Sequence, residues 1–132
     1  MNPVENIIAE STKLSFEKAN SFPEVLQKLK DAGIERYYAD LVKLEKTYYG
    51  KGTQSYQDKM PLKNPGSISE QFSEEGLRNA ITASQRGEID YSTFLHRAMQ
   101  SGVVSYTVFI NGNRNIFFGK KGEVWTEHFP QK

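Results

Sequence analysis

The spacing of apolar residues changes along the chain, and this change constrains the fold more than any other feature. Helical spacing in the first third gives way to alternation near residue 36, returns near residue 74 and gives way to alternation again after residue 102. An apolar residue every three or four positions indicates a helix with one buried side, and alternation indicates a half-buried strand. Helices followed by strands, twice over, favour a two-layer α+β domain with helices packed on an antiparallel sheet.

Capping signals place four helices, near 3–18, 22–32, 74–86 and 91–101. Ser21 and Glu24 match a capping box, in which the hydroxyl and the carboxylate each accept a backbone N–H. Ser73 and Asp90 are suited to cap the third and fourth helices. Gly33 is suited to end the second helix in the left-handed conformation of a Schellman motif.

Strand-forming residues fall into two groups. In the first group, 36–41 and 46–49 predict a hairpin with a short turn near 42–44, and 53–60 predicts a more polar edge strand. In the second group, 103–110, 115–118 and 123–129 predict a three-strand meander, which Pro130 closes. The elements run as two helices, a hairpin, a helical hairpin and the meander.

Eight side chains are the expected core: Leu29, Ile34, Leu77, Ile81, Phe94, Leu95, Tyr106 and Val108. Large apolar groups also occur on both faces of the predicted meander, at Ile116, Phe117, Phe118, Trp125 and Phe129. Helices cover one face of such a sheet. The other face requires either the N-terminal helix or a second copy of the chain, so a homodimer stays open as an alternative to core packing.

Composition limits the classes of function. The 132 residues suit a single domain spanning 1–132, and sixteen aromatic residues (8 Phe, 7 Tyr and 1 Trp) supply a core. The chain has no cysteine, which excludes disulfides, thiolate nucleophiles and sulfur-bound zinc. A net charge of +1 disfavours nucleic acid and membrane surfaces as partners. Without a targeting signal or a membrane-spanning stretch, we expect a cytoplasmic protein.

The sequence offers little for catalysis or metal binding. The only two histidines, His96 and His128, do not form a ligand pair with metal-binding spacing, so we expect no metal and no organic cofactor. Neither a Gly-x-Ser-x-Gly elbow nor a phosphate-binding glycine loop is present. We therefore assign no catalytic residue and expect the protein not to be an enzyme. Acid–base chemistry by tyrosine or histidine is the alternative.

Five residues of the predicted hairpin form the candidate binding site: Arg36, Tyr38, Asp40, Lys46 and Tyr48. With a three-residue turn, Asp40 would face Lys46 and Tyr38 would face Tyr48, so all five would project from one face. One interpretation is a solvated face with a cross-strand ion pair. The other is a recognition surface, because tyrosines beside an arginine are enriched at binding sites.

Two groups of residues carry a resemblance to a known family. The first covers 36–42 and 46–50, which read RYYADLV and KTYYG. The second covers QRGEIDY at 85–91 with Phe94, Leu95, Gly102 and 104–106, and it ends in FFG at 117–119, Gly122, Glu123 and EHFP at 127–130. Ser21–Glu24 (SFPE) also fits. These residues resemble the YbcV/YdfO-like family, a bacterial family of unknown function with prophage-borne members, some labelled phage envelope proteins. The resemblance implies a two-layer α+β fold and no known activity.

Three classes of function stay open. We favour a small non-catalytic binding or regulatory module of bacterial or prophage origin, acting on an unknown protein or small ligand. A small enzyme is second, and a phage structural component is third. A deep pocket gathering Arg36, Asp40 or His128 would favour the enzyme, whereas a flat patch of tyrosine and arginine would favour the binding module.

Overall fold

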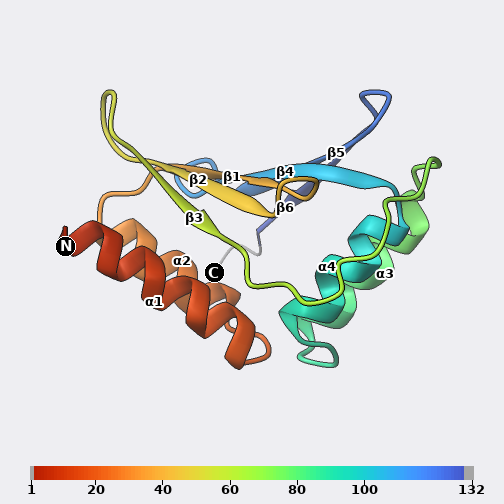
Figure 1. Ribbon diagram of the computed structural model, residues 1–132, viewed down its shortest axis with the longest axis horizontal. Coiled ribbons are helices and arrows are strands. Elements are labelled where there is room, and N and C mark those ends of the chain that lie inside the picture. The colour runs from red at the N-terminus through yellow and green to blue at the C-terminus, as the bar shows by residue number, and fades with distance from the viewer. Residues whose placement is uncertain (1, 130–132) are drawn as a thin grey trace.

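The computed structural model describes residues 2–129, and Pro130 therefore lies outside the described residues. Within this range the chain forms four helices and six strands (Figure 1). The helices are α1 (Pro3–Glu17), α2 (Phe22–Asp31), α3 (Glu74–Gln85) and α4 (Tyr91–Gln100). The strands are β1 (Arg36–Asp40), β2 (Glu45–Tyr49), β3 (Ser55–Lys59), β4 (Val103–Phe109), β5 (Arg114–Gly119) and β6 (Val124–His128).

All six strands join one antiparallel sheet in the order β3-β2-β1-β4-β5-β6. The hairpin and the meander meet where β1 pairs with β4, with Tyr38 opposite Thr107. Figure 1 shows both helix pairs on the same side of this sheet, α1 and α2 under one part of it and α3 and α4 under another. The α+β class expected from the sequence is confirmed.

The core lies between the helices and the face of the sheet that they cover, which we call the inner face. All eight side chains expected in the core are buried there, and Leu29, Leu77, Leu95 and Val108 have no exposed surface. The opposite face, which we call the outer face, has no helix over it in the part of the chain that the structure describes (Figure 1).

Most of the local helix signals are confirmed. Ser73 and Asp90 cap α3 and α4 by accepting the amides of Gly76 and Thr93. Gly33, at φ +87°, ends α2, and the amide of the next residue donates to the carbonyl of Leu29 at 2.9 Å, as in a Schellman motif.

The capping box at Ser21 is wrong. Ser21 is buried and its hydroxyl donates to the carbonyl of Leu14 near the end of α1, at 3.3 Å. The Glu24 carboxylate instead pairs with Lys18 at 3.1 Å. The turn between α1 and α2 brings the carbonyl of Leu14, which also accepts the amide of Lys18 at 3.0 Å, close to this hydroxyl. That tertiary contact replaces the local cap.

The register expected for the first hairpin is also wrong, by one residue. Asp40 pairs with Glu45 rather than with Lys46, and Tyr38 pairs with Thr47 rather than with Tyr48. The turn contains four residues because Leu44 adopts the left-handed conformation at φ +58° and its amide donates to the carbonyl of Asp40. A one-residue shift turns every side chain of β2 to the other face of the sheet.

Candidate functional site

The register divides the five candidate residues between the two faces. Arg36, Tyr38 and Asp40 lie on the outer face, because they alternate along β1 with the buried Tyr37 and Ala39. Their cross-strand partners on β2 are Tyr49, Thr47 and Glu45. Lys46 and Tyr48 lie on the inner face with the core. The single five-residue surface expected from the sequence therefore does not form, and each face has to be considered separately.

On the outer face, Arg36 is exposed and its guanidinium lies 3.9 Å from the centre of the Tyr49 ring. Tyr38 is half-buried at the middle of β1. The Asp40 carboxylate accepts the amides of Val42 and Lys43 at 2.9 and 3.0 Å, so it also stabilises the turn. These contacts place a cation and a carboxylate at opposite ends of β1, with a tyrosine between them.

The same face carries many large side chains for a surface without a helix over it. Five of them are half-buried: Tyr38, Tyr49, Phe109, Ile116 and Phe118. Val124 on β6 is 47% exposed. Exposed apolar patches rimmed by polar groups mark interaction sites. This face is therefore one candidate site.

On the inner face, Lys46 is only 4% exposed and Tyr48 only 1%. The Lys46 ammonium lies 4.6 Å from the centre of the Tyr91 ring and 5.2 Å from the centre of the Tyr37 ring. Cations are attracted to aromatic faces, but this attraction is much weaker than a buried ion pair in good geometry. Among the residues described, no carboxylate lies within 4 Å of this ammonium.

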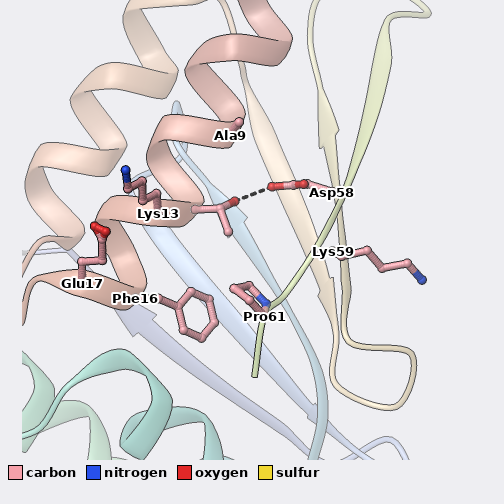
Figure 2. A pocket seen from close by; sticks show the side chains of 8 residues that line it. Ala9, Lys13, Phe16, Glu17, Asp58, Lys59 and Pro61 are labelled. Carbon is pink, nitrogen blue, oxygen red and sulfur yellow. Dashed lines mark hydrogen bonds between the residues drawn. The ribbon is translucent and has the colours of Figure 1, made fainter. Parts of the chain in front are cut away.

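Asp58, the cross-strand neighbour of Lys46, is bonded elsewhere. The two residues are directly opposite in the pairing of β2 with β3. The Asp58 carboxylate nevertheless accepts a hydrogen bond of 2.5 Å from the hydroxyl of Thr12 on α1 (Figure 2). A lysine and an aspartate in this relation ordinarily pair with each other. Here the described contacts of the amine are with aromatic rings, and Asp58 acts on it only through its charge, beyond 4 Å.

Burial shifts the pKa values in this region. Desolvation lowers the pKa of Lys46 to about 7, and the Asp58 carboxylate offsets only part of this effect. Burial also raises the pKa of Tyr37, Tyr48 and Tyr91 above the ordinary value. These phenols stay protonated at neutral pH, which disfavours the tyrosine bases considered from the sequence. Among these buried side chains, the amine of Lys46 is the one whose charge changes near neutral pH.

Tyr106 on β4 extends this group of phenols. Burial raises its pKa, and its hydroxyl is hydrogen-bonded to that of Tyr91 on α4. The pair links a helix to the centre of the sheet next to the ring that contacts Lys46. One hydroxyl donates and the other accepts, so this hydrogen bond offsets part of the cost of removing two polar groups from water.

A cleft of about 340 Å³ opens between α1 and β3 on the solvent side of the Thr12–Asp58 hydrogen bond. Figure 2 shows its lining, which combines apolar Ala9, Phe16 and Pro61 with charged side chains from both elements. The Phe16 ring packs edge-on against the Tyr91 ring, with the ring centres 4.9 Å apart. Along this path the Phe16 ring and then the Tyr91 ring lie between the cleft and the amine of Lys46.

The histidines do not join either site. The ring Nε2 of His96 is hydrogen-bonded to the carbonyl of Asn64 at 2.9 Å, and His128 is exposed on β6. Within residues 2–129, no three His, Asp or Glu side chains come together as a set of metal ligands.

Sequence reasoning missed Thr12, Asp58 and Tyr91, although it included Lys46. The sequence signal for an Asp58–Lys46 neighbourhood was present but ambiguous. Asp58 stands opposite Lys46 only if β3 is a true strand, and Lys46 is buried only if the first turn has four residues. Thr12 and Tyr91 come from helices, and their approach to the sheet depends on tertiary packing.

Fold and sites define an α+β domain whose antiparallel sheet has one face covered by helices and one face open. The chain belongs to the family described as "Protein of unknown function (DUF1398)", whose model matches residues 12–128. The match begins at Thr12 within α1 and includes every later helix and strand. No curated protein matches the chain. None of the helices in the described part of the chain is both long and apolar enough to span a membrane.

Proposed function

We propose that the protein is a small non-catalytic interaction module and that the outer face of its sheet is the interaction surface. One observation carries this proposal: large side chains from Tyr38 to Phe118 stand on a face over which the described chain places no helix. Outward aromatic groups add little to the stability of a solvated sheet, whereas they are enriched at recognition surfaces.

The occupant we propose is a second copy of this chain. Six strands spaced about 4.8 Å apart, each about five residues long, present roughly 500 Å² of sheet plane before the relief of the side chains is counted. Specific interfaces bury about 600–1,000 Å² on each partner. The face reaches the lower end of this range only when the relief of its side chains is added, which corresponds to a dimer of modest affinity.

Charge placement favours one arrangement of the two copies. Arg36 and Asp40 lie on the same face of β1, four residues apart, with Tyr38 midway. If two copies stack with β1 antiparallel to β1, a two-fold axis passes near Tyr38. Each Arg36 then faces the Asp40 of the second copy. Such self-complementarity is what a closed, isologous dimer requires.

Sedimentation equilibrium over about 1–200 µM tests the proposal, a range chosen for a small interface. We expect a concentration-dependent dimer for the natural chain. Tyr38→Lys places two like charges near the axis and should yield a monomer over the whole range. The matched control is Val42→Lys, because Val42 is 69% exposed in the turn and outside the proposed contact.

A monomer at every concentration would refute the proposal, as would a dimer that survives Tyr38→Lys. An open-ended assembly would instead favour the structural phage component. We extend the proposal to a cytoplasmic protein of bacterial or prophage origin, supported by the resemblance of 36–50 and 85–130 to YbcV/YdfO-like proteins.

A further inference from the structure

Among residues 2–129, Lys46 has no ionic partner, although a carboxylate lies opposite it on the next strand. Asp58 is directly opposite in the register, but Thr12 holds its carboxylate at 2.5 Å. A buried charge without a partner is costly, and buried lysines are usually paired. The structure therefore keeps an amine in its interior at some cost in stability.

Aromatic side chains enclose the Lys46 amine. The rings of Tyr37 and Tyr91 lie 5.2 and 4.6 Å from it. Tyr91 in turn contacts Phe16, which lines the cleft between α1 and β3. Thr12 and Asp58 also line that cleft (Figure 2). The cleft and the amine thus share the same intervening side chains.

Helix α1, which covers this region, is held by few fully buried apolar side chains. Of its fully buried residues, Ile8 is apolar, whereas Ser11 and Thr12 are polar. The Ser11 hydroxyl is buried without a hydrogen-bond partner. Such an unsatisfied group disfavours the closed position of the helix. Local opening at α1 would separate Ile8 and the partly buried Val4, Leu14 and Phe16 from the core.

We propose that Lys46 is the reactive amine of a small-molecule site beneath α1, that the cleft between α1 and β3 is its entrance, and that its ligands are small aldehydes or ketones held as an imine. This site is separate from the outer face proposed above for interaction between chains.

The chemistry balances without a redox partner. The unprotonated amine attacks the carbonyl carbon, and one of its two protons passes to the oxygen to give a neutral carbinolamine. The carbinolamine hydroxyl then leaves as water by taking up a proton from solvent, which gives a protonated C=N bond. Loss of the remaining N–H proton to solvent gives the neutral imine, so the net products are an imine and one water. A desolvated lysine is a usual nucleophile for this step. The pKa of about 7 at Lys46 supports the assignment, because the reactive form is then abundant at neutral pH.

The cleft lining suits a neutral carbonyl compound. Its charged side chains, Lys13 and Lys59 with Glu17 and Asp58, balance one another and give no net attraction for an anion. The apolar lining by Ala9, Phe16 and Pro61 suits a short hydrocarbon chain. The cleft volume of about 340 Å³ suits a small molecule.

Reductive alkylation of the folded chain with propanal and cyanoborohydride, followed by peptide mass spectrometry, tests the proposal. At pH 7 fewer than about one in a thousand ordinary lysines is unprotonated. We expect Lys46 to be alkylated with a rate that levels off above pH 7, following its pKa of about 7. Lys59, whose side chain is 78% exposed, is the comparison lysine measured in the same digest.

The pH profile of alkylation at Lys46 depends on the titratable and charged groups around its amine. The groups nearest Lys46 are the Asp58 carboxylate and the phenols of Tyr37, Tyr48, Tyr106 and Tyr91, and α1 adds Lys13 and Glu17 at the cleft. Burial keeps the phenols protonated at neutral pH, and the Asp58 carboxylate raises the pKa of Lys46. Asp58→Asn should therefore move the midpoint of the Lys46 profile to lower pH, and Asn can still accept from Thr12.

Leu95→Ala separates local opening from global unfolding. Leu95 is fully buried, and its truncation destabilises the whole fold. If alkylation proceeds through local opening at α1, its rate at Lys46 stays within about twofold of the natural chain. A rise in proportion to the unfolded fraction would overturn the proposal. It would also be overturned if Lys46 stayed unmodified while Lys59 reacted, or if both followed the same pH profile.

Discussion

Replacing Lys46 with methionine should change how the stability of the protein depends on pH. Methionine has a similar length and no charge, so it can occupy the space between the Tyr37 and Tyr91 rings. The natural lysine is 4% exposed and has no carboxylate within 4 Å among the described residues. The folded state therefore opposes the charged form, and the unfolded chain does not.

The magnitude follows from the pKa. Burial lowers it from 10.5 to about 7 in the folded state. At 1.36 kcal/mol for each pH unit, this difference corresponds to about 5 kcal/mol at most. Between pH 7 and 10.5 the unfolded chain binds more protons than the folded chain, so the free energy of unfolding rises with pH across this window. Below the folded pKa the destabilisation by the buried charge is present in full.

The tyrosines set the upper limit of this window. Their pKa values are raised by burial, so above about pH 10 they ionise in the unfolded chain while the folded chain keeps them neutral. Stability then falls as pH rises further. The natural chain should consequently be most stable near pH 9–10, higher than the range of about pH 5–8 that is usual for proteins.

Urea unfolding at pH 6, 7, 8, 9 and 10, followed by circular dichroism, measures the effect. Lys46→Met should be more stable than the natural chain at pH 6, and the difference should shrink by several kcal/mol toward pH 10. Lys59→Met is the control, because the Lys59 side chain on the neighbouring strand is 78% exposed. This control should differ from the natural chain by nearly the same amount at every pH.

A difference between Lys46→Met and the natural chain that stays constant from pH 6 to pH 10 would refute the reasoning. The amine would then titrate alike in the folded and unfolded chains, and its burial would carry no cost.

Two further changes test the packing. Leu95→Ala should cost about 2–5 kcal/mol in denaturant unfolding, because Leu95 is fully buried on α4; a loss below about half a kcal/mol would contradict its place in the core. Gly102→Ala should destabilise strongly or prevent folding, because Gly102 has φ +88° and an added Cβ would lie 2.5 Å from the carbonyl oxygen of Gln71. Thermal unfolding within 2 °C of the natural chain would show that this junction between α4 and β4 adapts.

Local sequence signals were sufficient for the elements. The helices begin and end within one residue of the expected bounds, because Ser73, Asp90 and Gly33 each act through contacts inside their own segment. Alternating side chains likewise identified the strands, including the polar edge strand β3. These interactions depend on residues only a few positions apart, so they can be inferred without knowledge of the whole fold.

The tertiary structure decided which face each strand presents. The period of a strand is two, so one additional residue in the turn before β2 exchanged its faces and moved Lys46 and Tyr48 into the core. The deciding contact, the amide of Leu44 on the carbonyl of Asp40, is not marked by a turn residue such as glycine or asparagine.

The sequence by itself determined a two-layer α+β domain with its helices, strands and core. Only the tertiary structure joined β1 to β4, drew Asp58 toward Thr12 and enclosed Lys46 between Tyr37 and Tyr91. The physical reason is how far apart in the sequence the interacting residues are. Caps and periodicity arise from neighbours in sequence. The environment of the buried Lys46 amine is instead set by four segments of the chain that meet only in the folded protein. Their relative placement minimises the energy of the whole core rather than that of any one segment.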